Sequence, residues 1–140
     1  MANVFLTGAF GNLGSYVLDL LIERQHKVTC FDLPNPHNKK VAAKYTNNVS
    51  IIWGDIRDES LYADAIGEQD AVIHLAAVLP PMTDDHPELA REINVGSTEK
   101  LLQCIAKSST NTVFVFASSF TVFGDNFDKP PPRFADEPVI

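Results

Sequence analysis

The sequence predicts an α/β fold with a doubly wound parallel sheet, and three observations favour it. Apolar runs alternate along the chain with segments of helical periodicity, as they do in βαβ units. Two of the runs, residues 71–73 and 112–116, are apolar throughout or nearly so, which is typical of strands covered on both faces. The first run, residues 4–6, leads into a glycine-rich turn at residues 7–14, where a helical pattern begins.

The positions of the elements follow from the same patterns. Five strands are expected, at residues 3–7, 27–32, 49–53, 70–75 and 112–117. Helices are expected at residues 12–25, 58–66 and 87–107, and the crossover at residues 37–47 is left open between loop and helix. In the first helix one apolar stripe is expected to face the sheet: Leu13, Val17, Leu20 and Leu21.

Composition limits the class of protein. With 140 residues, 45% of them hydrophobic, the chain suits one packed domain and is short for a two-domain enzyme. The net charge of −7 disfavours nucleic acid and anionic membranes as partners. The N-terminus has no charged leader and no apolar run reaches membrane-spanning length, so a cytoplasmic protein is expected. Cys30 and Cys104 lack metal-ligand spacing, so we expect reduced packing residues and no metal site.

The glycine-rich turn predicts a dinucleotide site. A strand that ends in such a turn, with a helix directly behind it, presents free backbone N–H groups and the positive end of a helix dipole to a pyrophosphate. Gly8 allows a sharp turn, Gly11 lets the backbone approach the phosphates, and Gly14 lets the helix pack close to the strand. Right-handed crossovers would place this turn beside a crevice at the carboxyl ends of the strands.

An acidic residue lies where a ribose-binding side chain is expected. Asp32 ends the second predicted strand, eighteen residues after Gly14, and could accept hydrogen bonds from the ribose hydroxyls. A carboxylate there repels a 2′-phosphate, so NAD is favoured over NADP. The alternative is that Asp32 only begins a solvated loop.

Further candidates stand at the ends of the third and fourth strands. Asp55 could accept from the exocyclic amine of an adenine that Ile56 flanks, or it could cap the next helix. Residues 75–77, Leu-Ala-Ala, follow the fourth strand and allow a cofactor to come close. His74, just before them, is interpreted as a core histidine.

Two more polar positions point to the same crevice. Asn94 interrupts the apolar stripe of the helix at residues 87–107, and a buried amide needs partners, whether backbone groups or a functional site. Ser118 and Ser119 follow the fifth strand, where they could bind a substrate oxygen or satisfy the strand end.

Together these motifs resemble the extended short-chain dehydrogenase/reductase family, the NAD-dependent sugar-nucleotide epimerases and dehydratases. The matching motifs run in order along the chain: the glycine turn, Asp32, Gly-Asp-Ile-Arg at 54–57, His-Leu-Ala-Ala at 74–77, Asn-Val at 94–95 and Ser-Ser-x-x-Val-Phe-Gly at 118–124. The resemblance implies a Rossmann-type fold in which residues 1–140 form an incomplete NAD-binding domain, without the substrate-binding region.

The resemblance also implies a role for each site residue. The pyrophosphate would be lined by Gly8, Gly11, Asn12, Leu13 and Gly14. Asp32 would take the ribose, Asp55 and Ile56 the adenine, and Leu75, Ala76 and Ala77 the nicotinamide side. Asn94 would support the site, and Ser119 would be the catalytic hydroxyl that orients a sugar-like substrate.

One departure from the family leaves two functions open. The family's Tyr-x-x-x-Lys pair is absent, because the residues four beyond Tyr16, Tyr45 and Tyr62 are not lysines. The expected function is therefore the NAD-binding part of an epimerase, dehydratase or reductase that acts by hydride transfer, with no turnover from these 140 residues alone. The alternative is a non-catalytic, redox-sensing or regulatory dinucleotide-binding module.

A homo-oligomer is expected as well. In the resembled family the helix that matches residues 87–107 packs against a second subunit, and here it would leave apolar side chains uncovered. These are Val95, Leu102 and Ala106.

Overall fold

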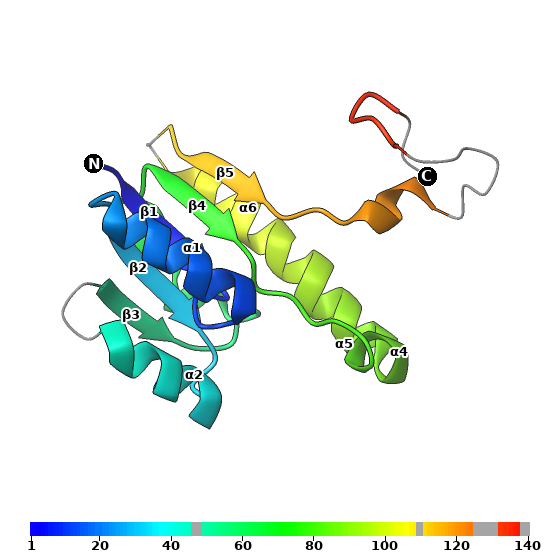
Figure 1. The fold of residues 1–140 in the computed structure, drawn as a ribbon, viewed down its shortest axis with the longest axis horizontal. Helices are drawn as coiled ribbons and strands as arrows, with labels where there is room; N and C mark the ends of the chain where they lie inside the picture. The colour runs from blue at the N-terminus through cyan, green and yellow to red at the C-terminus, as the bar shows by residue number, and fades with distance from the viewer. Residues whose placement is uncertain (46–48, 109–110, 125–131, 138–140) are drawn as a thin grey trace.

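A five-stranded parallel sheet forms the middle layer of the computed structural model (Figure 1). The structure describes residues 1–45, 49–108, 111–124 and 132–137. The strand order is β3-β2-β1-β4-β5, so the order of the strands reverses beside β1 and the predicted doubly wound sheet is confirmed. The strands are β1 (Asn3–Thr7), β2 (Lys27–Asp32), β3 (Val49–Trp53), β4 (Ala71–His74) and β5 (Val113–Phe116).

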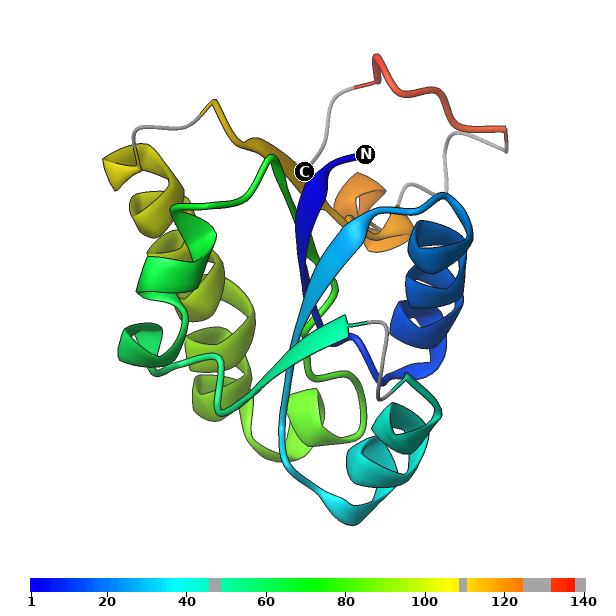
Figure 2. The ribbon, with the colours of Figure 1, turned by 90° about the vertical axis from the view of Figure 1, so that its left-hand side faces the viewer.

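Helices cover both faces of the sheet (Figure 2). On one face lie α1 (Asn12–Glu23) and α2 (Pro36–Ala42), and a 3-10 turn, Ala43–Tyr45, continues from α2. The expected crossover at 37–47 is thus helical as far as Tyr45, and its last two residues lie outside the described ones. On the other face lie α3 (Ala63–Ile66) and α6 (Ser97–Lys107).

Two of the expected helices are interrupted. The one at residues 58–66 consists of a 3-10 turn, Glu59–Leu61, and α3, with Tyr62 between them at a non-helical φ of −131°. The one at residues 87–107 consists of α5 (Pro87–Arg91), a π-helical turn (Glu92–Gly96) and α6. Two short elements were not expected from the sequence, α4 (Met82–Asp85) and a 3-10 turn after β5, Phe120–Phe123.

Two hydrophobic clusters hold the layers together. Neighbouring residues of β1 serve opposite faces, because side chains alternate along a strand: Leu6 packs toward α1 and Phe5 toward α6. The cluster on the α1 side is Leu6, Ala9, Phe10, Leu18, Val28, Cys30, Ala42 and Tyr45. The cluster on the α6 side is Phe5, Phe31, Ile56, Tyr62, Ile66, Val72, Leu101 and Cys104.

The apolar stripe expected on α1 is wrong in part. Leu13 and Leu20 are 58% and 51% exposed, whereas Gly14 and Leu18 are buried. The reason is that close contact at Gly14 decides which side of α1 meets the sheet. Successive residues are about 100° apart around a helix, so Leu13 and Leu20 lie well to one side of Gly14.

Gly8 and Gly14 fix the junction between β1 and α1. Gly8 has a φ of +65°, and a Cβ there would lie 2.8 Å from the backbone nitrogen of Ala76. A Cβ on Gly14 would overlap the carbonyl oxygen of Gly8 and lie 2.9 Å from the carbonyl carbon of Ala9. The expected roles of these two glycines, a sharp turn and a close helix, are therefore confirmed.

A hydrogen-bond network joins β1, β4 and the long helix. The buried Thr7 hydroxyl lies 2.7 Å from Nδ1 of His74 and accepts from the backbone amides of Leu75 and Ala76, both at 3.1 Å. Nε2 of His74 lies 3.1 Å from Oγ1 of Thr98, and that hydroxyl donates to the carbonyl of Asn94 at 2.7 Å. His74 is thus a core histidine, as expected.

The network determines the tautomer of His74. Because Thr98 uses its single hydrogen on Asn94, its oxygen must accept from Nε2–H of His74. Nδ1 then accepts from the Thr7 hydroxyl. Burial lowers the pKa of His74 to about 4, so the ring is neutral at pH 7.

We predict that Gly14→Ala lowers the free energy of unfolding by about 1–3 kcal/mol or more, because the new methyl group has to displace backbone atoms. Urea denaturation would measure the change. Gly96→Ala is the matched control, since a Cβ there has no neighbour within 4 Å and Gly96 has helical dihedral angles. If Gly14→Ala and Gly96→Ala had the same free energy of unfolding, the predicted effect of close packing at Gly14 would be contradicted.

We predict that His74 makes stability depend on pH between about 6.5 and 4. Its folded pKa lies below that of an unfolded histidine, so the unfolded chain takes up the proton first. The contribution is complete above about pH 6.5 and is lost as the pH falls toward 4, up to about 3 kcal/mol in all. His74→Gln, which has an amide donor and acceptor but does not titrate, should be flatter over this range. If the free energy of unfolding changed equally with pH in the wild type and in His74→Gln, the prediction would be contradicted.

Candidate functional site

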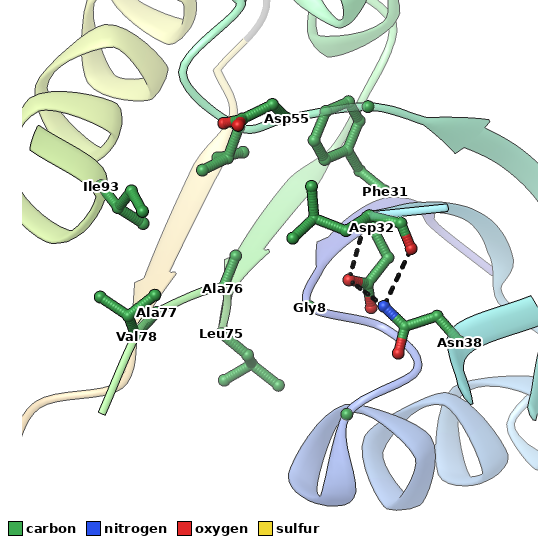
Figure 3. Close-up of a pocket in the computed structure, with 14 residues that line it drawn as sticks. Gly8, Phe31, Asp32, Asn38, Asp55, Leu75, Ala76, Ala77, Val78 and Ile93 are labelled. Atoms are coloured by element: carbon green, nitrogen blue, oxygen red, sulfur yellow. Dashed lines mark hydrogen bonds between the residues drawn. The ribbon is translucent and has the colours of Figure 1, made fainter. Parts of the chain in front are cut away.

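A cavity of about 210 Å³ opens at the carboxyl ends of the strands, where the strand order reverses (Figure 3). This is where doubly wound sheets bind ligands. Eight residues predicted from the sequence line it: Gly8, Gly11, Asp32, Asp55, Ile56, Leu75, Ala76 and Ala77. Six lining residues were not predicted: Phe31, Leu33, Asn38, Gly54, Val78 and Ile93.

The start of α1 is suited to an anion. Gly11 is the N-cap in an extended conformation and, as a glycine, makes no side-chain cap; among the described residues the first turn of the helix has no acidic side chain. The amide groups of that turn are therefore available to phosphate oxygens, with the helix dipole in the favourable direction. These are the properties that a pyrophosphate requires.

Gly11 differs from the other two glycines of the turn. A Cβ on Gly11 would meet only the carbonyl oxygen of Gly8, at 3.4 Å, and its φ of −73° suits any residue. The fold thus has little need of a glycine at this position, although the residue lines the cavity. Space left there by the missing side chain fits a closely bound ligand, as the sequence predicted for the phosphates.

Asp32 lies at the end of β2 with its carboxylate held in one orientation. Oδ2 accepts from the amide of Phe10, and Oδ1 accepts from the amide of Leu33 and from Nδ2 of Asn38, all at 2.8 Å. Burial raises the pKa of Asp32, and the two backbone amides act against that rise. The side chain lines the cavity, so Asp32 does more than begin a solvated loop.

Asp55 is ion-paired beside the cavity. Its carboxylate binds the Arg57 guanidinium in bidentate fashion, with Oδ2 2.6 Å from one terminal nitrogen, and this pairing lowers the pKa of Asp55. Arg57 also reaches Glu92 at 3.3 Å, which ties this loop to the π-helical turn. The alternative that Asp55 caps the next helix is wrong, because Asp58 accepts from the amide of Ser60 in that role.

Asn94 supports the wall of the cavity without lining it. Its Oδ1 accepts from the amide of Val78 at 2.9 Å, and its Nδ2 donates to the carbonyl of Val78 at 3.0 Å. The amide thus holds a lining residue through its backbone, which is the first of the two alternatives left open by the sequence. The π-helical turn contributes both Asn94 and the lining residue Ile93.

Four other predicted residues lie outside the cavity lining. Asn12 and Leu13 are exposed at the start of α1, and Gly14 is buried against Gly8. Ser119 is exposed and caps the 3-10 turn that follows β5: its Oγ accepts from the amide of Thr121 at 3.2 Å and from the Thr121 hydroxyl at 2.8 Å. The roles of these residues stay predictions.

Within the described part of the chain, no helix is long and apolar enough to cross a membrane.

Comparisons with known proteins show the family of the chain. The model of the NAD dependent epimerase/dehydratase family matches residues 4–139. The chain is 34% identical over 83% of its length to a decarboxylating sterol-4-alpha-carboxylate 3-dehydrogenase of Dictyostelium discoideum. It is 30% identical over 94% of its length to a UDP-N-acetyl-alpha-D-glucosaminuronate decarboxylase of Bacillus cytotoxicus. It covers 34% and 40% of these two relatives.

A solved structure has the same fold over the full chain. This is the WbmH enzyme of Bordetella bronchiseptica in complex with NAD+, which is 28% identical and superposes with a TM-score of 0.82. The superposition covers all of the present chain and 46% of the WbmH chain. NAD, the cofactor expected from Asp32 and the glycine turn, is the cofactor for which the matching family is named. The chain belongs to the NAD-dependent epimerase/dehydratase family.

Proposed function

We propose that this chain is the NAD-binding domain of an enzyme that oxidises a sugar-nucleotide-like alcohol by hydride transfer. The observation that carries the proposal is the cavity at the reversal of strand order, where an uncapped helix N-terminus and the Asp32 carboxylate lie at the same opening. The relatives are longer than the chain and differ in the substrates they are named for, a sterol and a nucleotide sugar. The nucleotide sugar is the substrate type that the sequence motifs favour.

The residues of the cavity divide the work of binding. Gly11 and the first turn of α1 would hold the pyrophosphate, and Asp32 would accept from the ribose hydroxyls. Leu75, Ala76 and Ala77 would leave room for the nicotinamide end, where the bound cofactor accepts or returns a hydride. Ser119 would orient the substrate hydroxyl.

A non-catalytic, redox-sensing module is the second candidate. The observation that favours it is the use of the Ser119 hydroxyl as a helix cap, which gives this residue a structural reason to be present. A version of the protein that also contains the family's Tyr-x-x-x-Lys pair would distinguish the two functions: Ser119→Ala should abolish turnover of a nucleotide sugar in an enzyme. A sensor would show no turnover of a nucleotide sugar either with Ser119 or with the alanine substitution.

We predict that the chain binds NADH more tightly than NADPH, by about 1–3 kcal/mol, because Asp32 would lose a ribose hydroxyl and face a phosphate in NADPH. Titration calorimetry with both dinucleotides would measure the difference. Gly11→Ala should weaken both by about 1–3 kcal/mol, since the new methyl group would take up space beside the cavity that Gly11 lines, and should leave the fold intact, since its nearest described neighbour is the Gly8 carbonyl oxygen at 3.4 Å. Equal affinities, or a preference for NADPH, would contradict the assignment of Asp32.

We predict that the chain self-associates. Val95 and Leu102 are 42% and 44% exposed, and β5 is an edge strand whose Val113 and Val115 are exposed too. Uncovered apolar area and an unpaired strand edge both favour association with a second copy. Sedimentation at several concentrations would test this, and a monomer at about 100 μM, above the micromolar range where such surfaces associate, would contradict it.

A further inference from the structure

Asn38 is a buried polar side chain at the mouth of the cavity. It lies in the first turn of α2, is 7% exposed, and lines the cavity. Its Nδ2 donates to Oδ1 of Asp32 at 2.8 Å and to the carbonyl of Leu33 at 3.0 Å, so both amide hydrogens are used (Figure 3). Its backbone amide is held in turn by the side chain of Asn35, the N-cap of α2.

The donors around Asp32 are all neutral. Two are backbone amides, of Phe10 and Leu33, and the third is the Asn38 amide. Among the residues that the structure describes, no lysine or arginine forms an ion pair with Asp32, whereas Asp55 in the same cavity is paired with Arg57. Of the titratable groups that the structure describes, His37 is the one whose charge lowers the pKa of Asp32. In the described part of the chain the carboxylate is thus held by neutral donors, with no lysine or arginine paired to it.

We infer that Asn38 is a specificity-determining residue that orients the Asp32 carboxylate so that the site prefers NADH to NADPH. The inference rests on the proposed function and names the group behind its cofactor preference. Hydrogen bonds from dipoles stabilise the charged carboxylate, which burial alone would disfavour. A cation at position 38 would stabilise it equally well but would also attract the 2′-phosphate.

The geometry explains how Asn38 affects both the binding of the ribose and the repulsion of a 2′-phosphate. Oδ1 of Asp32 already accepts two hydrogen bonds and Oδ2 accepts one, so Oδ2 retains the freer lone pair for a ribose hydroxyl. Without Asn38, Oδ1 would lose its side-chain donor and the carboxylate would be free to turn. That change would weaken the bond to the ribose and reduce repulsion of a phosphate.

Two variants of Asn38 test the inference, one without a donor and one with a charged donor. Binding is measured at pH 8, where an ordinary histidine carries little charge. Asn38→Leu removes the donor at similar volume and should weaken NADH binding roughly tenfold while NADPH binding is kept or improved. Asn38→Lys supplies a donor with a charge and should improve NADPH binding instead. In both variants the dissociation constant for NADPH divided by that for NADH should fall roughly tenfold.

Asn35→Ala is the matched control. It removes the cap that holds the backbone amide of Asn38 and leaves the Asn38 side-chain donor in place, so it should lower stability and change the ratio of dissociation constants much less than Asn38→Leu does. A ¹³C NMR titration of the Asp32 carboxyl in the cofactor-free chain gives a second readout. The carboxyl should titrate at higher pH in Asn38→Leu than in the wild type.

The outcomes separate this inference from the proposed function. If both Asn38 variants lose affinity for the two dinucleotides equally, or if Asp32 titrates as in the wild type, Asn38 is merely structural and the inference is wrong. NADH preference in the wild type would still stand in that case. A wild-type chain that binds neither dinucleotide would overturn the proposed function and this inference with it.

Discussion

The hydroxyl of Thr7 is the contact on which the site depends. It lies at the carboxyl end of the central strand and makes three hydrogen bonds: one to the His74 ring and two from the amides of Leu75 and Ala76. Those amides belong to the first residues after β4, where the chain leaves the sheet to form the cavity wall. The amide of Leu75 also donates to the Thr7 carbonyl, at 3.3 Å, so Thr7 holds the strand end through both its hydroxyl and its backbone.

His74 extends the same constraint to the opposite layer. Its ring is hydrogen-bonded to the hydroxyls of Thr7 and Thr98, and the Thr98 hydroxyl donates to the carbonyl of Asn94. The side chain of Asn94 then holds Val78, four residues beyond His74. The segment after β4 is therefore fixed at both ends by one continuous network, and a neutral imidazole is required because it must accept at one nitrogen and donate at the other.

The sheet and much of the site could be predicted from the sequence, because both follow from local patterns. Apolar runs gave the five strands within about one residue, and the glycine spacing identified the turn at Gly8. The buried side of α1 could not be predicted in the same way, since it is decided by the contact of Gly14 with Gly8 rather than by the distribution of leucines. The break at Tyr62 and the π-helical turn likewise depend on tertiary packing, which periodicity does not report.

Asn38 shows what kind of site residue the sequence conceals. Its neighbours Asn35 and Pro36 are ordinary signals for the start of a helix, so an asparagine three residues after the cap attracts no notice. Its importance comes from the position of α2 over the end of β2, which brings its amide to Asp32. Two carboxylates at neighbouring strand ends thus differ in a way that composition cannot reveal: Asp55 is neutralised by a cation, whereas Asp32 keeps its charge. A cavity that binds an anionic pyrophosphate at one helix terminus can use such a carboxylate, unpaired with lysine or arginine, to discriminate against a further phosphate.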